Sequence, residues 1–495
     1  TTYDHNTVDG TLKSVTENAN EALNSDSRTT SYTYDSNTKA LKSVSLADGD
    51  TVFTNTYTYD SAKRLSAIRH NGFDYTFAYD EFGNTKTIKV GNRTLTTNNY
   101  NTRNGKLLSS TYGNGDTVQY SYDNYERLAQ ENRDGDITSY TYNLAGQLTE
   151  ITDTTGKYTY YYDSIGRVTR MVYPDGGNLK PVYDKDNRLT AVHTNLGGTQ
   201  RTTGYTYLLD GRLSQTALPT GKTVTYSYDP LARLSGSGID GVLSSSYTYE
   251  SPGEGKTTPL VSSVTTNGKE TEYTYDAFGN ILTITEDGVL QHSYTYDARN
   301  QLVGETSGTD SYVYSYDAGG NLVSVQKNGE VIKSYTYGDA SWKDLLTAFN
   351  GQSITYDAIG NPLSYRGMTL SWEGGRRLAS VSKEGLSASY VYNTDGIRTQ
   401  KTVNGVTTNY YLDGNSILRQ VTGNDVLEFF YDANGVLGFY YNNTPYYYLK
   451  NLQGDIVGIL DANGTQVVSY TYDAWGAPLS VTGTGADTIG PLNPV

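Results

Sequence analysis

The sequence predicts an all-β protein, a long antiparallel meander of hairpins that spirals into a hollow shell (a β-cocoon). Two repeating features predict the strands: Tyr-Asp pairs recur along the 495 residues, and Asn-Gly or Asp-Gly pairs alternate with them. The third observation is composition. Hydrophobic residues make up 36% of the chain, below the roughly 45–50% of typical soluble domains. Aromatic residues reach 12%, and Tyr alone occurs 49 times, which argues against disorder and favours extensive β-structure.

The Tyr-Asp repeat has a period of about 21 residues. From Tyr34 to Tyr472, 438 residues are divided by 22 anchors into 21 intervals, and degraded copies such as Tyr142-Asn143 fill the gaps between intact ones. We take ten intact pairs as the structural anchors of the repeat: Tyr34 and Asp35, Tyr59 and Asp60, Tyr122 and Asp123, Tyr162 and Asp163, Tyr228 and Asp229, Tyr275 and Asp276, Tyr296 and Asp297, Tyr316 and Asp317, Tyr356 and Asp357, and Tyr472 and Asp473.

Each repeat is expected to form a strand, an Asp-led turn, a second strand and a tight turn. The Asp side chain can bond the backbone two residues on, and a following Gly supplies the left-handed position. The tight turns are expected at dipeptides whose central residues favour positive φ. These dipeptides are Asn71-Gly72, Asp134-Gly135, Asn267-Gly268, Asp287-Gly288, Asn328-Gly329, Asn404-Gly405 and Asn463-Gly464.

The number of strands implies curvature. The repeat predicts about 44 strands, and open sheets of more than about ten strands curl or split. A ribbon that coils on itself has little solid core, so it needs large side chains that tolerate half-burial. Tyr meets this need with an apolar ring and a polar tip, and in Tyr-x-Tyr both rings lie on one face of the strand.

Three segments depart from the repeat. Residues 342–349 (WKDLLTAF) are the one plausible helical turn inside the array, and residues 251–259 read as a polar loop between repeats. Residues 482–495 are rich in Gly and Pro and show no strand pattern. No composition shift divides the array into independent domains.

Charge and composition exclude several function classes. Lys and Arg number 38 against 53 Asp and Glu, a net charge of −15, which argues against nucleic acid as a partner. No stretch approaches 18 consecutive apolar residues, so no membrane span is expected. The absence of Cys excludes disulfides, thiolate metal sites and Cys nucleophiles.

The sequence supplies no catalytic or metal-binding constellation, and we expect no enzyme, cofactor or metal. The four His residues (His5, His70, His193 and His292) are far apart in sequence, and neither Asp48-Gly49-Asp50 nor Asp134-Gly135-Asp136 fits a calcium loop. Gly clusters lack a phosphate-loop pattern and are read as turns. Trp342, Trp372 and Trp475 break the Tyr pattern, and packing explains them better than local ligand binding.

The repeat resembles that of the YD-repeat, or Rhs-repeat, proteins. These include bacterial Rhs polymorphic toxins, wall-associated proteins of Gram-positive bacteria, the C components of insecticidal Tc toxins, and teneurins. The resemblance covers essentially the whole chain. Residues 446–478 look like the start of the Rhs-associated core, so the chain is divided into a YD-repeat shell (1–445) and a core start (446–495). The family's protease motif and toxin domain would follow Val495, and we expect the chain to be part of a longer protein.

The resemblance implies a container. By analogy with the family, the shell would be non-catalytic and would house and protect a C-terminal toxin passenger of the parent chain, used against competing cells. Residues 342–367 and 371–380 look like repeats of Gram-positive members, which implies a secreted or wall-associated protein of such a bacterium. The alternative is a cell-surface adhesion module that binds a glycan or a protein, as in teneurins.

Overall fold

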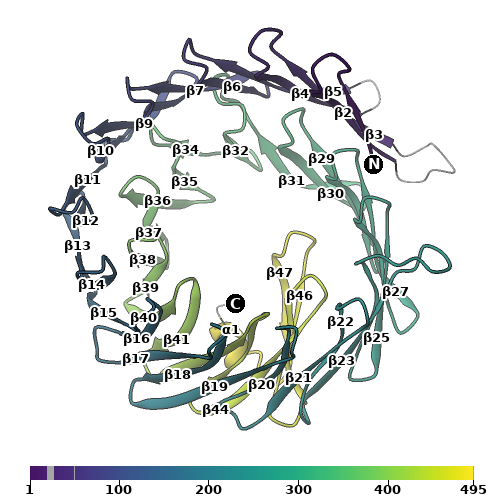
Figure 1. Ribbon diagram of the computed structural model, residues 1–495. Coiled ribbons are helices and arrows are strands. Elements are labelled where there is room, and N and C mark those ends of the chain that lie inside the picture. The colour runs from purple at the N-terminus through teal and green to yellow at the C-terminus, as the bar shows by residue number, and fades with distance from the viewer. Residues whose placement is uncertain (19–26, 49–50, 494–495) are drawn as a thin grey trace. The chain divides into compact units, whose positions relative to one another are not determined.

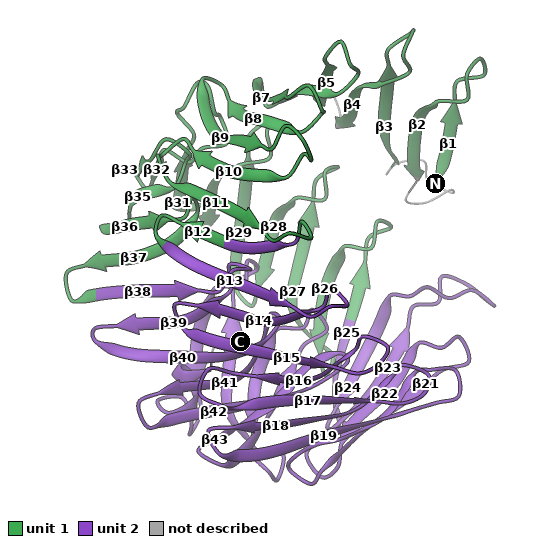
Figure 2. Ribbon diagram, turned by 60° about the vertical axis from the view of Figure 1, so that its left-hand side comes forward, with its two compact units in different colours: residues 1–126, 131–135, 273–386 green, residues 127–130, 136–272, 387–495 purple. Residues whose placement is uncertain are grey.

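The computed structural model describes residues 1–18, 27–48 and 51–493 (Figure 1). These residues form 47 strands and one short helix, which confirms the all-β prediction. They group into two compact units, each assembled from segments that are not adjacent in the chain (Figure 2). Unit 1 contains Thr1–Glu126, Glu131–Gly135 and Tyr273–Leu386, and unit 2 contains Arg127–Gln130, Asp136–Glu272 and Ser387–Val495. The sequence gives no sign of this division because the units are defined by spatial contacts between distant repeats.

The early strands of the chain run from β1 to β12. Their bounds are β1 Thr2–His5, β2 Leu12–Asn18, β3 Ser27–Tyr34, β4 Leu41–Asp48, β5 Thr51–Tyr59, β6 Leu65–His70, β7 Phe73–Tyr79, β8 Thr85–Val90, β9 Arg93–Tyr100, β10 Leu107–Tyr112, β11 Thr117–Tyr122 and β12 Leu128–Arg133. The next strands, mostly in unit 2, are β13 Asp136–Tyr142, β14 Leu148–Asp153, β15 Gly156–Tyr162, β16 Val168–Val172, β17 Asn178–Tyr183, β18 Leu189–Leu196, β19 Thr199–Tyr207, β20 Leu213–Ala217, β21 Thr223–Tyr228, β22 Leu234–Ile239, β23 Leu243–Tyr249, β24 Val261–Thr266 and β25 Lys269–Tyr275.

The chain then returns to unit 1 with a second set of strands. These are β26 Ile281–Glu286, β27 Val289–Tyr296, β28 Leu302–Ser307, β29 Asp310–Tyr316, β30 Leu322–Lys327, β31 Glu330–Thr336, β32 Ala348–Phe349, β33 Gln352–Ser353, β34 Thr355–Tyr356, β35 Pro362–Tyr365, β36 Met368–Glu373 and β37 Arg377–Lys383. The last strands are β38 Leu386–Tyr392, β39 Arg398–Val403, β40 Val406–Asp413, β41 Ser416–Thr422, β42 Asp425–Asp432, β43 Gly435–Tyr441, β44 Thr444–Lys450, β45 Ile456–Leu460, β46 Gln466–Tyr472 and β47 Pro478–Thr482, and helix α1 spans Ile489–Leu492.

Consecutive strands pair antiparallel, as in β5 with β6 and β15 with β16. The register shifts by one residue at the second Tyr of the anchor, between Thr58 and Tyr59 and again between Tyr161 and Tyr162. Such a bulge bends its strand and increases its twist. Because the bulge recurs at this position in repeat after repeat, curvature is built into the meander.

The two faces of the strands differ in chemistry. In the triplet Tyr140-Thr141-Tyr142 both Tyr side chains are half-buried and the Thr is exposed, as a period of two requires. On the exposed face, hydroxyl groups pair across strands, as Thr141 does with Thr149 (3.4 Å) and Thr471 with Ser480 (2.7 Å). The Tyr side chains therefore line the more buried face.

The tight turns have the predicted conformation. Asn71 and Gly72 have φ values of 47° and 78°, and Asn328 and Gly329 have 51° and 87°. Positive φ at both central residues is the mark of the type I′ hairpin turn. The prediction for Asn463-Gly464 is wrong, because this pair closes an Asp-led corner in which Asp461 accepts the Asn463 N–H (2.8 Å).

Within the described residues, side chains are densely packed on both faces of β42–β45, near the C-terminus. Phe429 and Phe430 are neighbours on β42 and point to opposite faces, yet they are 7% and 3% exposed. One face of β42–β45 packs with β46 and α1 around Phe439, and the other packs against Leu218, Val224 and Ile239 of the early strands of unit 2. Outside this region most strand residues are only half-buried, so the strands form thin layers with little core.

Two expectations about irregular segments are corrected. Residues 342–349 form turns followed by β32 and contain no helical turn. The helix lies instead in the Gly/Pro-rich tail, where Ile489 of α1 is 3% exposed in the C-terminal core. Tertiary packing stabilises this four-residue helix, since isolated helices so short are unstable in water. Residues 251–259 form a loop, as predicted, with one isolated bridge between Gly253 and Lys256.

Candidate functional site

The Tyr-Asp corner is the most frequent polar constellation in the structure. In its intact form, one Asp carboxylate organises the whole turn. Asp163 Oδ1 accepts the backbone N–H groups of Ile165 (3.1 Å) and Arg167 (2.9 Å), and Oδ2 accepts Arg167 Nε (2.7 Å). Gly166 supplies the left-handed position, with φ of 93°. The corner is therefore a closed hydrogen-bonded unit rather than an open carboxylate.

All ten anchor carboxylates accept the backbone N–H two residues on. They are Asp35, Asp60, Asp123, Asp163, Asp229, Asp276, Asp297, Asp317, Asp357 and Asp473. At Asp60, the backbone N–H of Arg64 holds the pKa of the carboxyl below its usual range, and the Arg64 guanidinium adds to this effect. A carboxylate held ionised in this way suits a turn, whereas a general acid needs a raised pKa.

The second Tyr of the anchor joins one repeat to the one before. Tyr228 donates from its hydroxyl to the backbone carbonyl of Leu213, at 2.8 Å. The same bond is made to a residue 10 to 18 positions back by Tyr59, Tyr122, Tyr162, Tyr316, Tyr356 and Tyr472. Tyr34, Tyr275 and Tyr296 end β3, β25 and β27 at the equivalent position. These bonds form a ladder along the corner edge of each meander, which we call the tyrosine ladder.

Arginine reinforces the ladder at the position four residues after the Asp. Arg64 donates from Nη1 to the backbone carbonyl of Asp80, one repeat ahead (2.9 Å), and its guanidinium lies 4.6 Å from the Tyr79 ring centroid. Arg167 does the same toward Asp184 and Tyr183. The sequence analysis missed the role of this Arg, because Arg alternates with Asn and Gln at this position. Its fixed offset from the Asp was nevertheless a usable signal.

Unit 1 holds its two sets of strands together through an extended loop, residues 338–347. Trp342 Nε1 donates to the Tyr75 hydroxyl (3.2 Å), and Arg93 donates to Asp339 (2.5 Å). Asn71, at the turn between β6 and β7, donates to Asp344 (3.0 Å). Trp342 thus serves packing, as the sequence analysis favoured. Trp372 donates to the Pro362 carbonyl (2.8 Å), and Trp475 is 54% exposed.

In unit 2 the late strands meet the early ones through Tyr and charged side chains. Tyr226 donates to the Asp432 carboxylate, and Tyr173 donates to the Leu412 carbonyl (2.8 Å). Arg201 donates to Glu428 (2.9 Å) beside a small cavity of about 160 Å³, and its guanidinium lies 3.8 Å from the Tyr440 ring centroid. The Arg201 guanidinium contacts both the Glu428 carboxylate and the Tyr440 ring, so this contact is structural.

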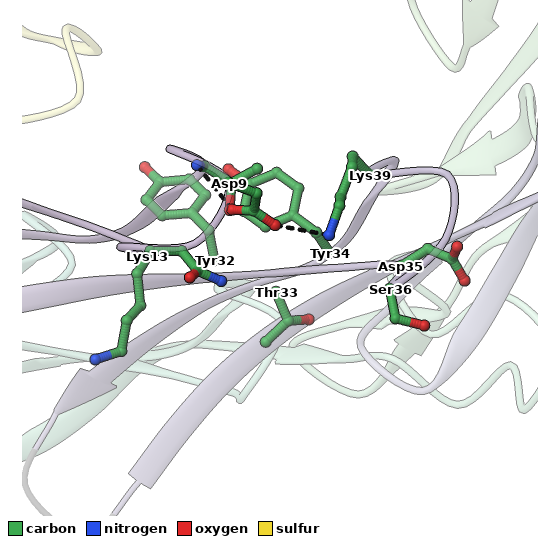
Figure 3. A pocket seen from close by; sticks show the side chains of 10 residues that line it. Asp9, Lys13, Tyr32, Thr33, Tyr34, Asp35, Ser36 and Lys39 are labelled. Atoms are coloured by element: carbon green, nitrogen blue, oxygen red, sulfur yellow. Dashed lines mark hydrogen bonds and ion pairs between the residues drawn. The ribbon is translucent and has the colours of Figure 1, made fainter.

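A polar groove of about 320 Å³ lies on β1–β3 and is lined by Asp9, Lys13, Tyr34 and Lys39 among others (Figure 3). Asp9 pairs with Lys39 at 2.7 Å, and Lys13 pairs with Asp4 at 3.1 Å. The hydrogen bond from Lys39 lowers the pKa of Asp9 to about 2. The charges of Asp9, Lys13 and Lys39 are therefore already paired within the chain.

The residues weighed for catalysis stay separate. His70 Nδ1 lies 2.8 Å from Asn55 Oδ1, His193 Nδ1 lies 2.8 Å from Thr202 Oγ1, and His292 Nδ1 lies 3.7 Å from Glu305. His5 is exposed on β1. Among residues 1–18, 27–48 and 51–493, no group of three or more His, Asp or Glu side chains is placed to hold a metal ion. Gly49 and Asp50 of the cluster at 48–50 lie outside the described residues.

The repeat architecture matches a known family. The family described as the teneurin YD-shell matches residues 73–273 and 269–492. The chain belongs to the teneurin YD-shell family. This confirms the resemblance to YD-repeat proteins that the Tyr-Asp period indicated.

Two curated relatives come from Bacillus. The chain is 30% identical over 352 residues to the tRNA3(Ser)-specific nuclease WapA of Bacillus spizizenii, an alignment that covers 68% of this chain and 12% of that protein. It is 37% identical over 147 residues to the tRNA nuclease WapA of Bacillus subtilis, covering 27% of this chain and 6% of that protein. The chain therefore spans a small part of the length of these relatives.

Solved structures share the fold. The chain superposes on a crystal structure of TcdB2-TccC3 with a TM-score of 0.64 and 17% identity, covering 93% of this chain and 29% of that one. A Photorhabdus luminescens Tc holotoxin pore gives a TM-score of 0.63 at 17% identity, covering 93% and 28%. At this identity the likeness shows the fold. In the described part of this chain, no helix is long and apolar enough to cross a membrane.

Proposed function

We propose that this chain forms the wall of a hollow YD-repeat shell that encloses and protects a C-terminal toxin passenger of its parent protein. The wall itself is non-catalytic, and the parent is a secreted or wall-associated protein of a Gram-positive bacterium that acts against competing cells. The observation that carries the proposal is the match of residues 73–273 and 269–492 to the teneurin YD-shell family, together with strands whose side chains are mostly half-buried.

The tyrosine ladder explains how a thin layer can be stable without a filled core. Each rung joins neighbouring repeats at the corner edge, and the Arg of one corner stacks on the Tyr of the next. The wall is thus stabilised along its length, by contacts between neighbours, in the manner of repeat proteins. Such a wall can enclose a volume that a globular core would fill.

The relatives support a toxin passenger. Two Bacillus relatives are named as tRNA nucleases, and the Photorhabdus structure is that of a Tc holotoxin pore. The matched regions make up 12% and 6% of those nucleases, so the nuclease activity of the relatives can lie outside the region shared with this chain. The shared region is the YD-shell, which is why we assign a housing role to it and the toxic activity to another segment.

Small-angle X-ray scattering tests the hollow wall. A filled protein of 495 residues has a radius of gyration of about 23 Å. A shell of the same mass should exceed this value clearly, and its pair-distance distribution should be shifted toward long distances. A filled globule at about 23 Å, or the profile of an elongated rod, would contradict the proposal.

Protease protection tests the enclosed passenger. In the parent protein, the passenger should resist a protease that digests it readily once it has been separated from the wall. Equal digestion in both forms would contradict the encapsulation while leaving the hollow wall in place.

A further inference from the structure

The corners of the late repeats in unit 1 insert a side chain into the early strands. The inserted residue is the one two positions after the Asp. After Asp276 it is Phe278, whose ring centroid lies 4.3 Å from the Arg28 guanidinium. After Asp357 it is Ile359, which is fully buried, and a Cβ placed on Gly113 would lie only 3.1 Å from its Cγ2 atom.

The receiving residues lie on the opposite edge of the early meander. Arg28 is the second residue of β3, whose other end is the Tyr-Asp anchor, and Gly113 lies in the turn between β10 and β11. Phe53, near the start of β5, receives Arg299 of the next late corner at 4.0 Å. Within unit 1, the edge of the late strands that carries the Asp-led corners therefore docks on the opposite edge of the early strands, which carries the tight turns. We call an edge that carries the tight turns an Asn-Gly edge.

The early strands of unit 2 also have an edge that carries the Asp-led corners, and apolar side chains in these corners are exposed to solvent. Leu144, Ile165, Leu209 and Leu231 are 102%, 71%, 108% and 62% exposed, and each lies one or two positions into its corner. These corners lie between β13 and β14, β15 and β16, β19 and β20, and β21 and β22. Alternate turns of an antiparallel meander lie on one edge, so the four side chains form a row. We call it the leucine row.

An unfilled Asn-Gly edge is present on the late strands of unit 1. Among residues 1–18, 27–48 and 51–493, a Cβ on Gly288, Gly308 or Gly329 would meet nothing within 4 Å. On the occupied edge of the early strands, by contrast, a Cβ on Gly91 would lie 2.7 Å from the Ser341 side chain of the docked loop. Val289 and Val331 lie close to the unfilled turns and are 61% and 59% exposed. Val289 is the first residue of β27 and Val331 is the second residue of β31.

We propose that the leucine row of one molecule docks on this free Asn-Gly edge of a second copy of the chain. The contact repeats, between molecules, the corner-to-edge docking that the chain makes within unit 1. Because the two surfaces differ, the association is head-to-tail and does not bury one patch against itself. The inference is independent of the housing role, since a monomeric wall can still enclose a passenger.

Sedimentation velocity over a concentration series tests the proposal. The wild-type chain should associate with a dissociation constant in the micromolar range, as expected for a modest interface. Two variants remove one surface each: I165S/L231S for the row, and V289K/V331K for the edge. Each should raise the dissociation constant about tenfold or more. V313S, at a 46% exposed position in the middle of β29, is the matched control and should associate like the wild type.

Mixing the two variants decides the geometry. The row variant keeps its edge and the edge variant keeps its row, so an equimolar mixture should form heterodimers that neither variant forms alone. Circular dichroism confirms that each variant is folded. A wild-type chain that stays monomeric at about 100 µM would overturn the proposal. So would an edge variant that self-associates like the wild type, because the row would then bind itself.

Discussion

Replacing Phe439 with Ala should destabilise unit 2 strongly. Phe439 is fully buried on β43, and its ring lies 5.8 Å from Phe429, 5.6 Å from Tyr446 and 5.4 Å from Tyr448, measured between centroids. Removing a buried Phe side chain costs about 3–5 kcal/mol, through lost transfer energy and the cavity left behind. For a unit of roughly 250 residues, each kcal/mol lowers Tm by about 2–4 °C, so the expected shift is about 6–20 °C.

Differential scanning calorimetry measures this shift directly. F82A is the matched control, since Phe82 is 61% exposed at its corner and its loss should lower Tm by about 2 °C or less. If F439A shifts Tm by only about 2 °C or less, as F82A should, the two-sided packing of β42–β45 is not the main core of unit 2. A shift of about 6 °C or more from both variants would instead mean that the thin layers of the meander are packed as tightly as the C-terminal strands.

Three further predictions concern the ladder, the docked loop and alkaline pH. Y228F loses the hydroxyl bond to Leu213 and should cost about 1 kcal/mol in urea unfolding, a value that Y161F, at a 48% exposed ring, should not approach. R93M breaks the pair with the mostly buried Asp339 and should cost about 1–3 kcal/mol, with partial recovery in R93K; equal stability of R93M and wild type would show that the contacts of Trp342 and Asp344 are enough to hold the loop. Burial raises the pKa of Tyr205 to about 12, above the ordinary value of 10, so its contribution to stability is complete below pH 10 and is lost as pH rises toward 12. In urea unfolding, Y205F should therefore lose less stability between pH 10 and pH 12 than the wild type does, and equal losses in both proteins would refute the reasoning.

Much of the local structure was predictable from the chain because each rule acts over a few residues. An Asp followed two positions later by a free backbone N–H forms a corner, and Asn71-Gly72 forms a type I′ turn, whatever surrounds them. The wrong prediction at Asn463-Gly464 has the same origin. The dipeptide is common to both kinds of turn, and Asp461, two residues earlier, decides between them through its carboxylate.

The candidate site was less predictable. The Asp anchors were found by their period, and in the structure all ten carboxylates accept the backbone N–H two residues on, as Asp35, Asp163 and Asp473 do. The tyrosine ladder was not foreseen, because its acceptor is a backbone carbonyl and carries no sequence signal. The helical turn expected at 342–349 failed for a related reason. Trp342 and Asp344 bond to early strands about 270 residues away, and these contacts outweigh local helix propensity.

The sequence by itself determined the unit of construction, which is a hairpin with an Asp-led corner at one end and a Gly turn at the other, repeated about every 21 residues. Turn chemistry and the period of two act between near neighbours, so the order of residues is enough to specify them. Only the tertiary structure decided which repeats meet. Ile359 and Leu231 occupy the same corner position, yet one is fully buried and the other is 62% exposed. The difference lies in whether a distant edge covers the corner, and that depends on curvature summed over many strands.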